Sequence, residues 1–449
     1  MKSNEIVNIF IGSAGLGISQ SLYDQYCHEH FIGMDGKPTD DSSITSMNLS
    51  NRRSTMFREC KDGTYTSNAL IIDSEPESMA ILRKGQYRNL FPQRQLTTIK
   101  EHACTYASGH NSLGKQHIEE VTQNIRRLAE STNNLQGFNV VISIDGGLGS
   151  GFGGLVLQKI NEDFGKKMKF CSALFPHTKS DIVVGYYNTV LSLHDILDHT
   201  EIITFYDKTT ISQYLDCQLG IYDADYADIN QVIARSISMQ SAASRFSMNE
   251  GCLVSMQDLY TSMVPYNRIK IMIPSMVTSG TSDSQAGAEL SAVEMAYRSF
   301  DADCSLAGVI NPHEHKIFAT ACYMRCSHRI TDLSAAFAGV LGYRAIEWAD
   351  WSPKTISYCV DRRPTTVPPQ SSGSVFASDT MSTLLVNSSA AGHMLAVLNN
   401  RFDLTYAKRG FIASFRMEEG DFVEARQDLA SLEGDYEEVC ISTAEGEDD

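Results

Sequence analysis

The chain has 449 residues, a formal net charge of −17, 42% hydrophobic residues and 11 cysteines. This length predicts two or three domains, and the acidic balance argues against nucleic acid as a main partner. No run approaches the roughly 20 apolar residues of a membrane span, and the first residues are too polar for a signal peptide. We therefore expect a soluble, intracellular protein with reduced, scattered thiols.

The chain opens with a strand that runs through a glycine turn into a helix. Residues 5–11 (EIVNIFI) predict the strand, and 12–17 (GSAGLG) predict the turn. From Ile18 onward, apolar residues recur at helical spacing. The polar residues 33–68 predict a long surface loop before the next strand.

The next predicted strand ends in two carboxylates, Asp73 and Glu75, before a helix that starts at Pro76. A carboxylate at the carboxyl end of a strand, close to phosphate-binding turns, is well placed to hold Mg²⁺ or its water. Capping of the following helix by the same carboxylates is an equally good explanation of the local sequence.

Residues 145–154 (DGGLGSGFGG) form a second glycine turn, between an apolar strand over 138–144 and an amphipathic helix over 154–164. Such a turn presents backbone N–H groups and the positive end of a helix dipole, which predicts phosphate binding. Its GxGxxG spacing matches a dinucleotide fingerprint, but the acidic partner of that fingerprint and a Gly-Lys-Ser/Thr are both missing. A turn that serves only strand–helix packing remains the alternative.

Strands and helices alternate up to residue 207, which predicts a doubly wound parallel sheet. The ligand of such a sheet lies at the carboxyl ends of the strands, where the polar and glycine turns fall. The elements that follow the first glycine turns are helices over 115–132 and 186–199 and strands over 168–175 and 201–207.

A long helix is predicted over 227–246. Tyr226 and Asn230 are four residues apart at its start and share a face, so a ring could stack on a base while an amide reads the base edge. On the pattern alone, an ordinary helix start explains this pair equally well. The apolar stripe of the helix is formed by Ile229, Val232, Ile233 and Ile237.

A shorter helix is predicted over 252–263, with Asp258 opposite its apolar side and exposed. The apolar side is formed by Leu253, Met256, Tyr260 and Met263. An exposed aspartate usually only aids solubility. The following segments predict a second, mixed sheet with helices between its strands; the strand segments are 268–276, 317–326, 345–351 and 355–360.

The last part of the chain predicts two helices, over 388–410 and 419–439, and an acidic end. From Arg416 onward the chain has 13 acidic and 2 basic residues, typical of a solvated face or a docking surface for basic partners. Phe422, Ala425, Leu429 and Leu432 form the apolar stripe of the last helix.

From end to end, these segments resemble the tubulin family, and α-tubulin in particular. GSAGLG resembles the first nucleotide loop of the family, DSEP (73–76) the loop with a magnesium-linked glutamate, and DGGLGSG (145–151) the signature GGGTGSG. Further matching stretches are MVPYNRI (263–269), RFDLTYAKRGF (401–411), the helix over 419–439 and RPTTVPP (363–369), the last resembling an insertion that α-tubulin has and β-tubulin lacks.

The resemblance implies an α/β fold of the tubulin type. A GTP-binding domain with a doubly wound parallel sheet is expected over 1–207, and the core helix with a mixed-sheet intermediate domain over 208–385. A pair of C-terminal helices is expected over 386–438, followed by an acidic, disordered tail over 439–449.

The resemblance also implies GTP and Mg²⁺ as cofactors, with β-tubulin as partner in a heterodimer and polymer, in cytoplasmic microtubules. The GTP of this subunit would not be hydrolysed, but Asp258 falls where α-tubulin places a glutamate that orients the attacking water in the next β-subunit. Microtubule motors and associated proteins would dock on the C-terminal helices. The implied nucleotide-binding residues are Ser13, Glu75 (also for the metal), Ser143, Gly146, Gly147, Gly149, Ser150, Tyr226 and Asn230.

The departures from the family cluster around the nucleotide. The altered positions are Ser13, Gly17, His102, Cys104, Thr105, Asp145, Leu148, Gly185 and Lys208. Asp145 replaces the first signature glycine, Gly185 a glutamate that touches the ribose, and Lys208 an asparagine at the guanine. Each lost hydrogen bond would weaken binding by about 1–3 kcal/mol. Outside the site, Asp41 falls on the acetylatable lysine, and the lateral-contact loop 279–290 lacks its aromatic residue.

Three functions follow from this sequence. The first is a divergent α-tubulin-like structural subunit that binds GTP, pairs with β-tubulin and polymerises. The second is a regulatory or capping subunit with weakened nucleotide binding that does not form a normal lattice. The third is an autonomous GTPase, which the outward direction expected for Asp258 disfavours.

Overall fold

The computed structural model describes residues 4–39, 53–176, 182–246, 250–251, 255–278, 290–308, 315–342, 346–361 and 380–441. Asp41, the insertion 363–369, nearly all of the loop 279–290 and most of the acidic tail lie outside these residues.

One large sheet organises the described chain. Its strands are β1 (Glu5–Ile11), β4 (Ala69–Asp73), β5 (Leu96–Thr98), β6 (Leu135–Ser143), β7 (Met168–Phe175), β8 (Ile202–Asp207), β9 (Glu250–Gly251), β10 (Ile271–Thr278), β11 (Ile317–Arg325), β12 (Ile356–Asp361) and β13 (Met381–Ser388). Within the described residues these eleven strands run in the order β5-β4-β1-β6-β7-β8-β10-β13-β11-β12-β9.

The half from β5 to β10 is parallel throughout, as the alternation of strands and helices predicts. The half from β10 to β9 mixes antiparallel and parallel pairs, which confirms the mixed sheet. It is not a separate sheet, because Ile271 of β10 pairs with Ile203 of β8 and joins the two halves edge to edge.

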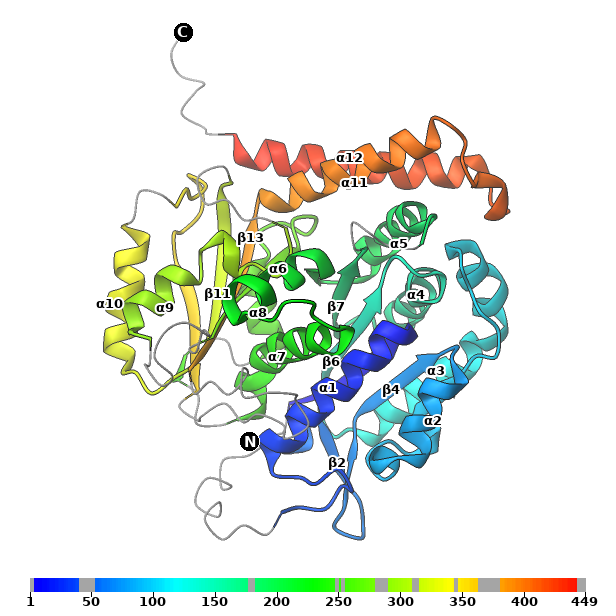
Figure 1. Cartoon of the computed structure of the whole chain (residues 1–449), viewed down its shortest axis with the longest axis horizontal. Coiled ribbons are helices and arrows are strands. Elements are labelled where there is room, and N and C mark those ends of the chain that lie inside the picture. Colours follow the sequence, from blue (N-terminus) through cyan, green and yellow to red (C-terminus); the bar gives the residue numbers. More distant parts are fainter. Residues whose placement is uncertain are drawn as a thin grey trace.

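Helices cover both faces of the sheet (Figure 1). They are α1 (Gly12–His30), α2 (Pro76–Lys84), α3 (Lys115–Ser131), α4 (Gly153–Phe164), α5 (Gly185–His199), α6 (Lys208–Leu219), α7 (Tyr226–Arg245), α8 (Met256–Met263), α9 (Ala292–Arg298), α10 (Ile330–Leu341), α11 (Ala390–Tyr406) and α12 (Glu419–Cys440). The apolar sides of α1, α2, α6, α7 and α8 meet in one cluster, and those of α3, α4, α5 and α9 to α12 meet in the other. No helix of the described residues has the length and apolarity needed to cross a membrane.

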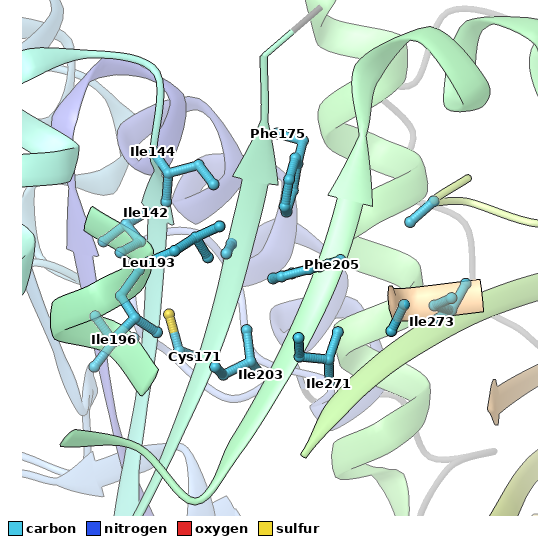
Figure 2. Packing of buried hydrophobic residues seen from close by; sticks show 14 of the residues in the cluster. Ile142, Ile144, Cys171, Phe175, Leu193, Ile196, Ile203, Phe205, Ile271 and Ile273 are labelled. Atoms are coloured by element: carbon cyan, nitrogen blue, oxygen red, sulfur yellow. The ribbon is translucent and has the colours of Figure 1, made fainter. Parts of the chain in front are cut away.

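The parallel strands are buried on both faces, so they read as apolar runs rather than alternating ones. All seven residues of β1 are buried. Figure 2 shows one face, where Ile142, Cys171 and Ile203 from adjacent strands pack under Leu193 and Ile196 of α5. This packing holds the carboxyl ends of neighbouring strands at one edge of the sheet, where the polar turns meet.

Three local predictions are wrong. The glycine turns predicted over 12–17 and 145–154 are mostly helical, because α1 begins at Gly12 directly after β1 and a helix begins at Leu148. The loop predicted over 33–68 contains a hairpin of β2 (Phe57–Glu59) and β3 (Tyr65–Ser67) in its described part, because cross-strand pairing overrides its polar composition. The segment 345–351 forms no strand where it is described; a single bridge joins Trp348 to Ile317.

The helical stripes predicted from spacing are largely confirmed. Ile229, Val232, Ile233 and Ile237 of α7 are buried, as are Phe422, Ala425, Leu429 and Leu432 of α12. In α8, Met256 and Met263 are buried but Tyr260 is only partly so, and Leu253 lies outside the described residues.

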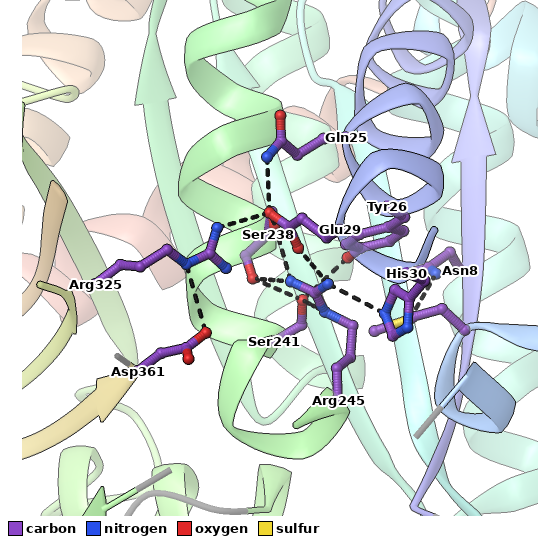
Figure 3. A network of polar contacts seen from close by, with 11 residues as sticks. Asn8, Gln25, Tyr26, Glu29, His30, Ser238, Ser241, Arg245, Arg325 and Asp361 are labelled. Carbon is purple, nitrogen blue, oxygen red and sulfur yellow. Dashed lines mark hydrogen bonds and ion pairs between the residues drawn. The ribbon is translucent and has the colours of Figure 1, made fainter. Parts of the chain in front are cut away.

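A buried network of charges links α1, α7 and the mixed half of the sheet (Figure 3). The Glu29 carboxylate accepts hydrogen bonds from Arg245 of α7 and Arg325 of β11. Arg325 also pairs with Asp361 of β12. Nothing in the local sequence predicts this network, since its members come from distant segments.

Candidate functional site

The two glycine turns lie next to each other at the carboxyl edge of the sheet. β1 and β6 are neighbouring parallel strands, so the segments that follow them meet. Gly12 has φ +83°, a conformation that favours glycine, and a Cβ built on it would lie 3.9 Å from the backbone N of Gly149. The structure therefore brings both predicted phosphate turns together.

The second turn combines packing with open space. A Cβ on Gly149 would lie 2.1 Å from the Ser143 carbonyl oxygen, and one on Gly147 would lie 2.6 Å from the Thr105 backbone N. These two glycines are required by close backbone contacts. A Cβ on Gly146, in contrast, would meet no atom within 4 Å, so this residue faces space that a ligand could fill.

The helix after this turn begins as a π-helical turn, η6 (Leu148–Phe152), that continues into α4. Its start offers backbone N–H groups and the positive end of a helix dipole to an anion. Ser150 is fully buried, and its hydroxyl lies 3.4 Å from the Gly147 carbonyl oxygen. Ser13 is exposed on the first turn of α1.

Asp145 forms an ion pair with Lys208. Asp145 Oδ2 lies 3.6 Å from Lys208 Nζ, and the Ser143 hydroxyl donates to Asp145 Oδ1 at 2.5 Å. A Cβ on Gly185, the first residue of α5, would lie 3.8 Å from Asp145 Cβ. Three of the departures from the family pattern are thus in one place.

Asn188 on α5 holds this region together. Its Nδ2 donates to the carbonyl oxygens of Asp145 and Cys104 at 2.9 and 3.2 Å, and its Oδ1 accepts from the backbone N of Tyr106. The side chain is fully buried. No sequence motif marks Asn188; the signal that could have revealed it is an amide on the first turn of α5, next to the buried Tyr187 and Val190.

The carboxyl end of β4 carries Asp73 and, two residues later, Glu75, the carboxylates predicted to hold a cation. Burial raises the pKa of Asp73, and its Oδ2 is buried with no hydrogen-bond partner among the described residues. Glu75 is exposed and accepts from the Ser78 hydroxyl at 2.7 Å, although as N-cap of α2 it makes no side-chain bond to the helix backbone. The capping alternative therefore fails for Glu75, and these carboxylates fit a cation that binds jointly to them and to phosphate.

No group of three or more His, Cys, Asp or Glu side chains in the described residues could hold a metal by itself.

The start of α7 carries Tyr226 and Asn230, the pair predicted to bind a base. Tyr226 is 75% exposed, so its ring is open to a stacking partner. A Cβ on Gly17 of α1 would lie 2.5 Å from Asn230 Nδ2. The Asn230 amide therefore uses the space that the missing side chain at Gly17 leaves, and a larger residue at position 17 would displace it.

Asp258 makes its hydrogen bonds to Ser255 and not to residues of this site. Its Oδ2 accepts from the Ser255 backbone N at 2.9 Å, and the Ser255 hydroxyl accepts from the Asp258 N at 3.1 Å. This reciprocal pair is a capping box at the start of α8. The carboxylate is partly buried rather than exposed, a correction to the sequence prediction, because it folds back over its own helix end.

The arrangement offers amide donors to an anion, carboxylates to a cation and an aromatic–amide pair to a base. A model of the GTPase domain of the Tubulin/FtsZ family matches residues 5–216. The chain is 34% identical over 447 residues to the tubulin alpha-2B chain of Physarum polycephalum, and the match covers 98% of each chain.

Proposed function

Because the chain belongs to the tubulin family, as an α-tubulin-like member, we propose that it is a structural subunit that binds GTP with Mg²⁺, pairs with β-tubulin and polymerises into cytoplasmic microtubules. The observation that carries this proposal is the meeting of the two glycine turns, with Gly12 against Gly149 and open space beside Gly146. Two separate strand–turn–helix units converge there on one anion.

The nucleotide would span the carboxyl edge of the sheet. The phosphates would lie at Gly146, Gly147, Gly149 and Ser150, close to Ser13 and Ser143. The base would stack on Tyr226 and be read by Asn230. Asp73 and Glu75 would hold Mg²⁺, directly or through water, and the ion would neutralise phosphate charge.

Asp258 would act on the GTP of the partner β-subunit. In a head-to-tail polymer this carboxylate would be offered to the GTP of the next β-subunit, where it would orient the attacking water. The Ser255 N–H binds Oδ2, so Oδ1 of this partly exposed carboxylate would be the atom that contacts the partner. The nucleotide of this chain would stay unhydrolysed.

The pair α11 and α12 would form the surface for motors and associated proteins. The two helices lie side by side across one side of the molecule (Figure 1). Exposed acidic residues of this surface suit basic partners; they include Asp403, Glu418, Glu419, Asp421, Glu424, Glu437 and Glu438.

The test is to express the full chain with β-tubulin, purify the complex through a tag on this chain, and identify and count the nucleotide released on denaturation. We expect β-tubulin to copurify and a guanine nucleotide to be present in each subunit. A complex whose guanine nucleotide is accounted for by β-tubulin alone would overturn GTP binding by this chain.

A second candidate is a regulatory or capping subunit that pairs without propagating a lattice. The bonding of Asp258 to its own helix end favours it, since a carboxylate one methylene shorter than glutamate and turned back reaches less far. Light microscopy of the tagged chain decides between the two, because a lattice subunit lines whole filaments and a capping subunit marks only ends.

A further inference from the structure

The Asp145 carboxylate lies beside the second glycine turn. Asp145 directly precedes Gly146, and its side chain points to the starts of α5 and α6. These helices follow β7 and β8, and the strand order β4-β1-β6-β7-β8 places their starts further along the carboxyl edge than the glycine turns, on the side away from Asp73. A nucleotide with its phosphates at the glycine turns and its sugar extending along this edge, away from Asp73, would bring that sugar to Asp145.

The chemistry of this group selects its ligand. An ionised carboxylate only accepts hydrogen bonds, so it suits the hydroxyls of a sugar and not the oxygens of a phosphate. Asp145 Oδ1 accepts one bond from Ser143, and the 3.6 Å separation of Oδ2 from Lys208 Nζ is longer than a hydrogen bond. The carboxylate therefore keeps acceptor capacity for a ligand.

Lys208 makes this acceptor compatible with a polyphosphate. The Asp145 and Lys208 side chains are 7% and 15% exposed, so their interaction is screened less than that of a surface pair. An unpaired carboxylate beside the phosphate turn would repel the ligand, and the ammonium group cancels that charge.

We propose that Asp145, oriented by Ser143 and neutralised by Lys208, accepts hydrogen bonds from the ribose hydroxyls of the bound nucleotide and makes the site selective for ribonucleotides. This inference rests on the proposed binding of GTP. It gives this chain its own sugar contact at a position where Gly185 offers no side chain.

The test compares GTP with 2′,3′-dideoxy-GTP in the complex of the full chain with β-tubulin, by competition for the site of this chain. We expect the wild type to bind GTP at least about tenfold more tightly than the dideoxy nucleotide. Asp145→Gly should bring that ratio close to one. Asp145→Asn, which keeps the size and the bond from Ser143, should reduce it severalfold and guards against misfolding of the glycine variant.

Two further variants complete the design. Lys208→Asn should weaken both nucleotides alike, because it leaves Asp145 unneutralised near the phosphates. The matched control is Asp163→Asn on α4, which removes an exposed ion pair with Arg126 of α3 and should leave the ratio unchanged. The sugar contact would be overturned if the wild type bound GTP and the dideoxy nucleotide equally tightly, or if both Asp145 variants kept the wild-type affinity ratio. If Asp145→Asn weakened both nucleotides equally, Asp145 would instead accept from an N–H of the base. Absence of guanine nucleotide from the wild-type chain would instead refute the proposed function.

Discussion

Glu29 on α1 and Arg325 on β11 form a buried ion pair, in which Arg325 Nη1 donates to Glu29 Oε1 at 2.9 Å. The two residues are 296 positions apart, and Arg245 of α7 binds the other carboxylate oxygen. Although burial favours the neutral acid, the two guanidinium groups hold the pKa of Glu29 well below its usual range. The pair fastens the parallel half of the sheet to the mixed half through α7 (Figure 3).

Glu29→Gln should destabilise the protein by about 3–5 kcal/mol at neutral pH, because two buried guanidinium groups lose their counter-charge. Thermal or urea unfolding of the full chain measures this. Since the folded pKa is lowered, the contribution of Glu29 is present above its unfolded pKa and is lost as pH falls below about 4. Equal stability of Glu29→Gln and the exposed control Glu119→Gln would contradict the expectation.

Asn188→Ala should loosen the nucleotide site, since two carbonyl oxygens and one N–H lose their buried partner. Each unsatisfied group costs about 1–3 kcal/mol. We expect a lower melting temperature and at least tenfold faster loss of nucleotide, about the rate change of a single lost bond. Asn161→Ala on α4, whose amide faces His199, is the control and should retain nucleotide normally.

Glu75→Gln should weaken magnesium-dependent retention of nucleotide with little effect on folding, because Glu75 is exposed. The measurement is nucleotide release with and without EDTA. Chelation should speed release from the wild type much more than from Glu75→Gln. Glu77→Gln, an exposed carboxylate on the first turn of the same helix, should behave as wild type; if both variants do, Glu75 does not serve the metal.

Asp258→Asn should slow GTP hydrolysis in copolymers with β-tubulin by about a hundredfold or more, since a positioned acid–base side chain typically contributes about 10²–10⁴-fold to the rate. The amide oxygen can still accept from Ser255, so the helix cap is kept. Phosphate release during assembly measures the effect. Hydrolysis at the wild-type rate, with assembly intact, would remove Asp258 from the reaction.

Asp24→Asn should stabilise the protein near pH 7. Burial raises the pKa of Asp24 to about 6, although its Oδ2 accepts from the Tyr87 hydroxyl at 2.9 Å. The folded state therefore holds an extra proton between about pH 4 and 6, and stability falls as pH rises through that window. The variant should gain about 1–3 kcal/mol above it and nothing near pH 4. Asp62→Asn, at an exposed position, should show no such pH dependence.

Much of the fold was predictable from the sequence because it depends on local periodicity. Short stretches of sequence are enough to show the apolar runs of β1 and β7 and the apolar stripes of α7 and α12. The alternation of strands with helices follows from such stretches taken in order. The glycine turns after β1 and β6 are local signals too, and a parallel sheet brings the ends of adjacent strands together. Sequence alone thus predicted a phosphate site at one edge of the sheet.

The tertiary structure decided everything that depends on distant pairs. Only folding shows that Asp145 and Lys208, each an isolated departure in the sequence, neutralise each other, or that Asn230 lies in the space left at Gly17. It also decided that Gly147 and Gly149 are required by close backbone contacts while Gly146 faces open space. The physical reason is that charge pairing and close contact act over a few ångströms in space, and residues that meet at that distance can be hundreds of positions apart along the chain.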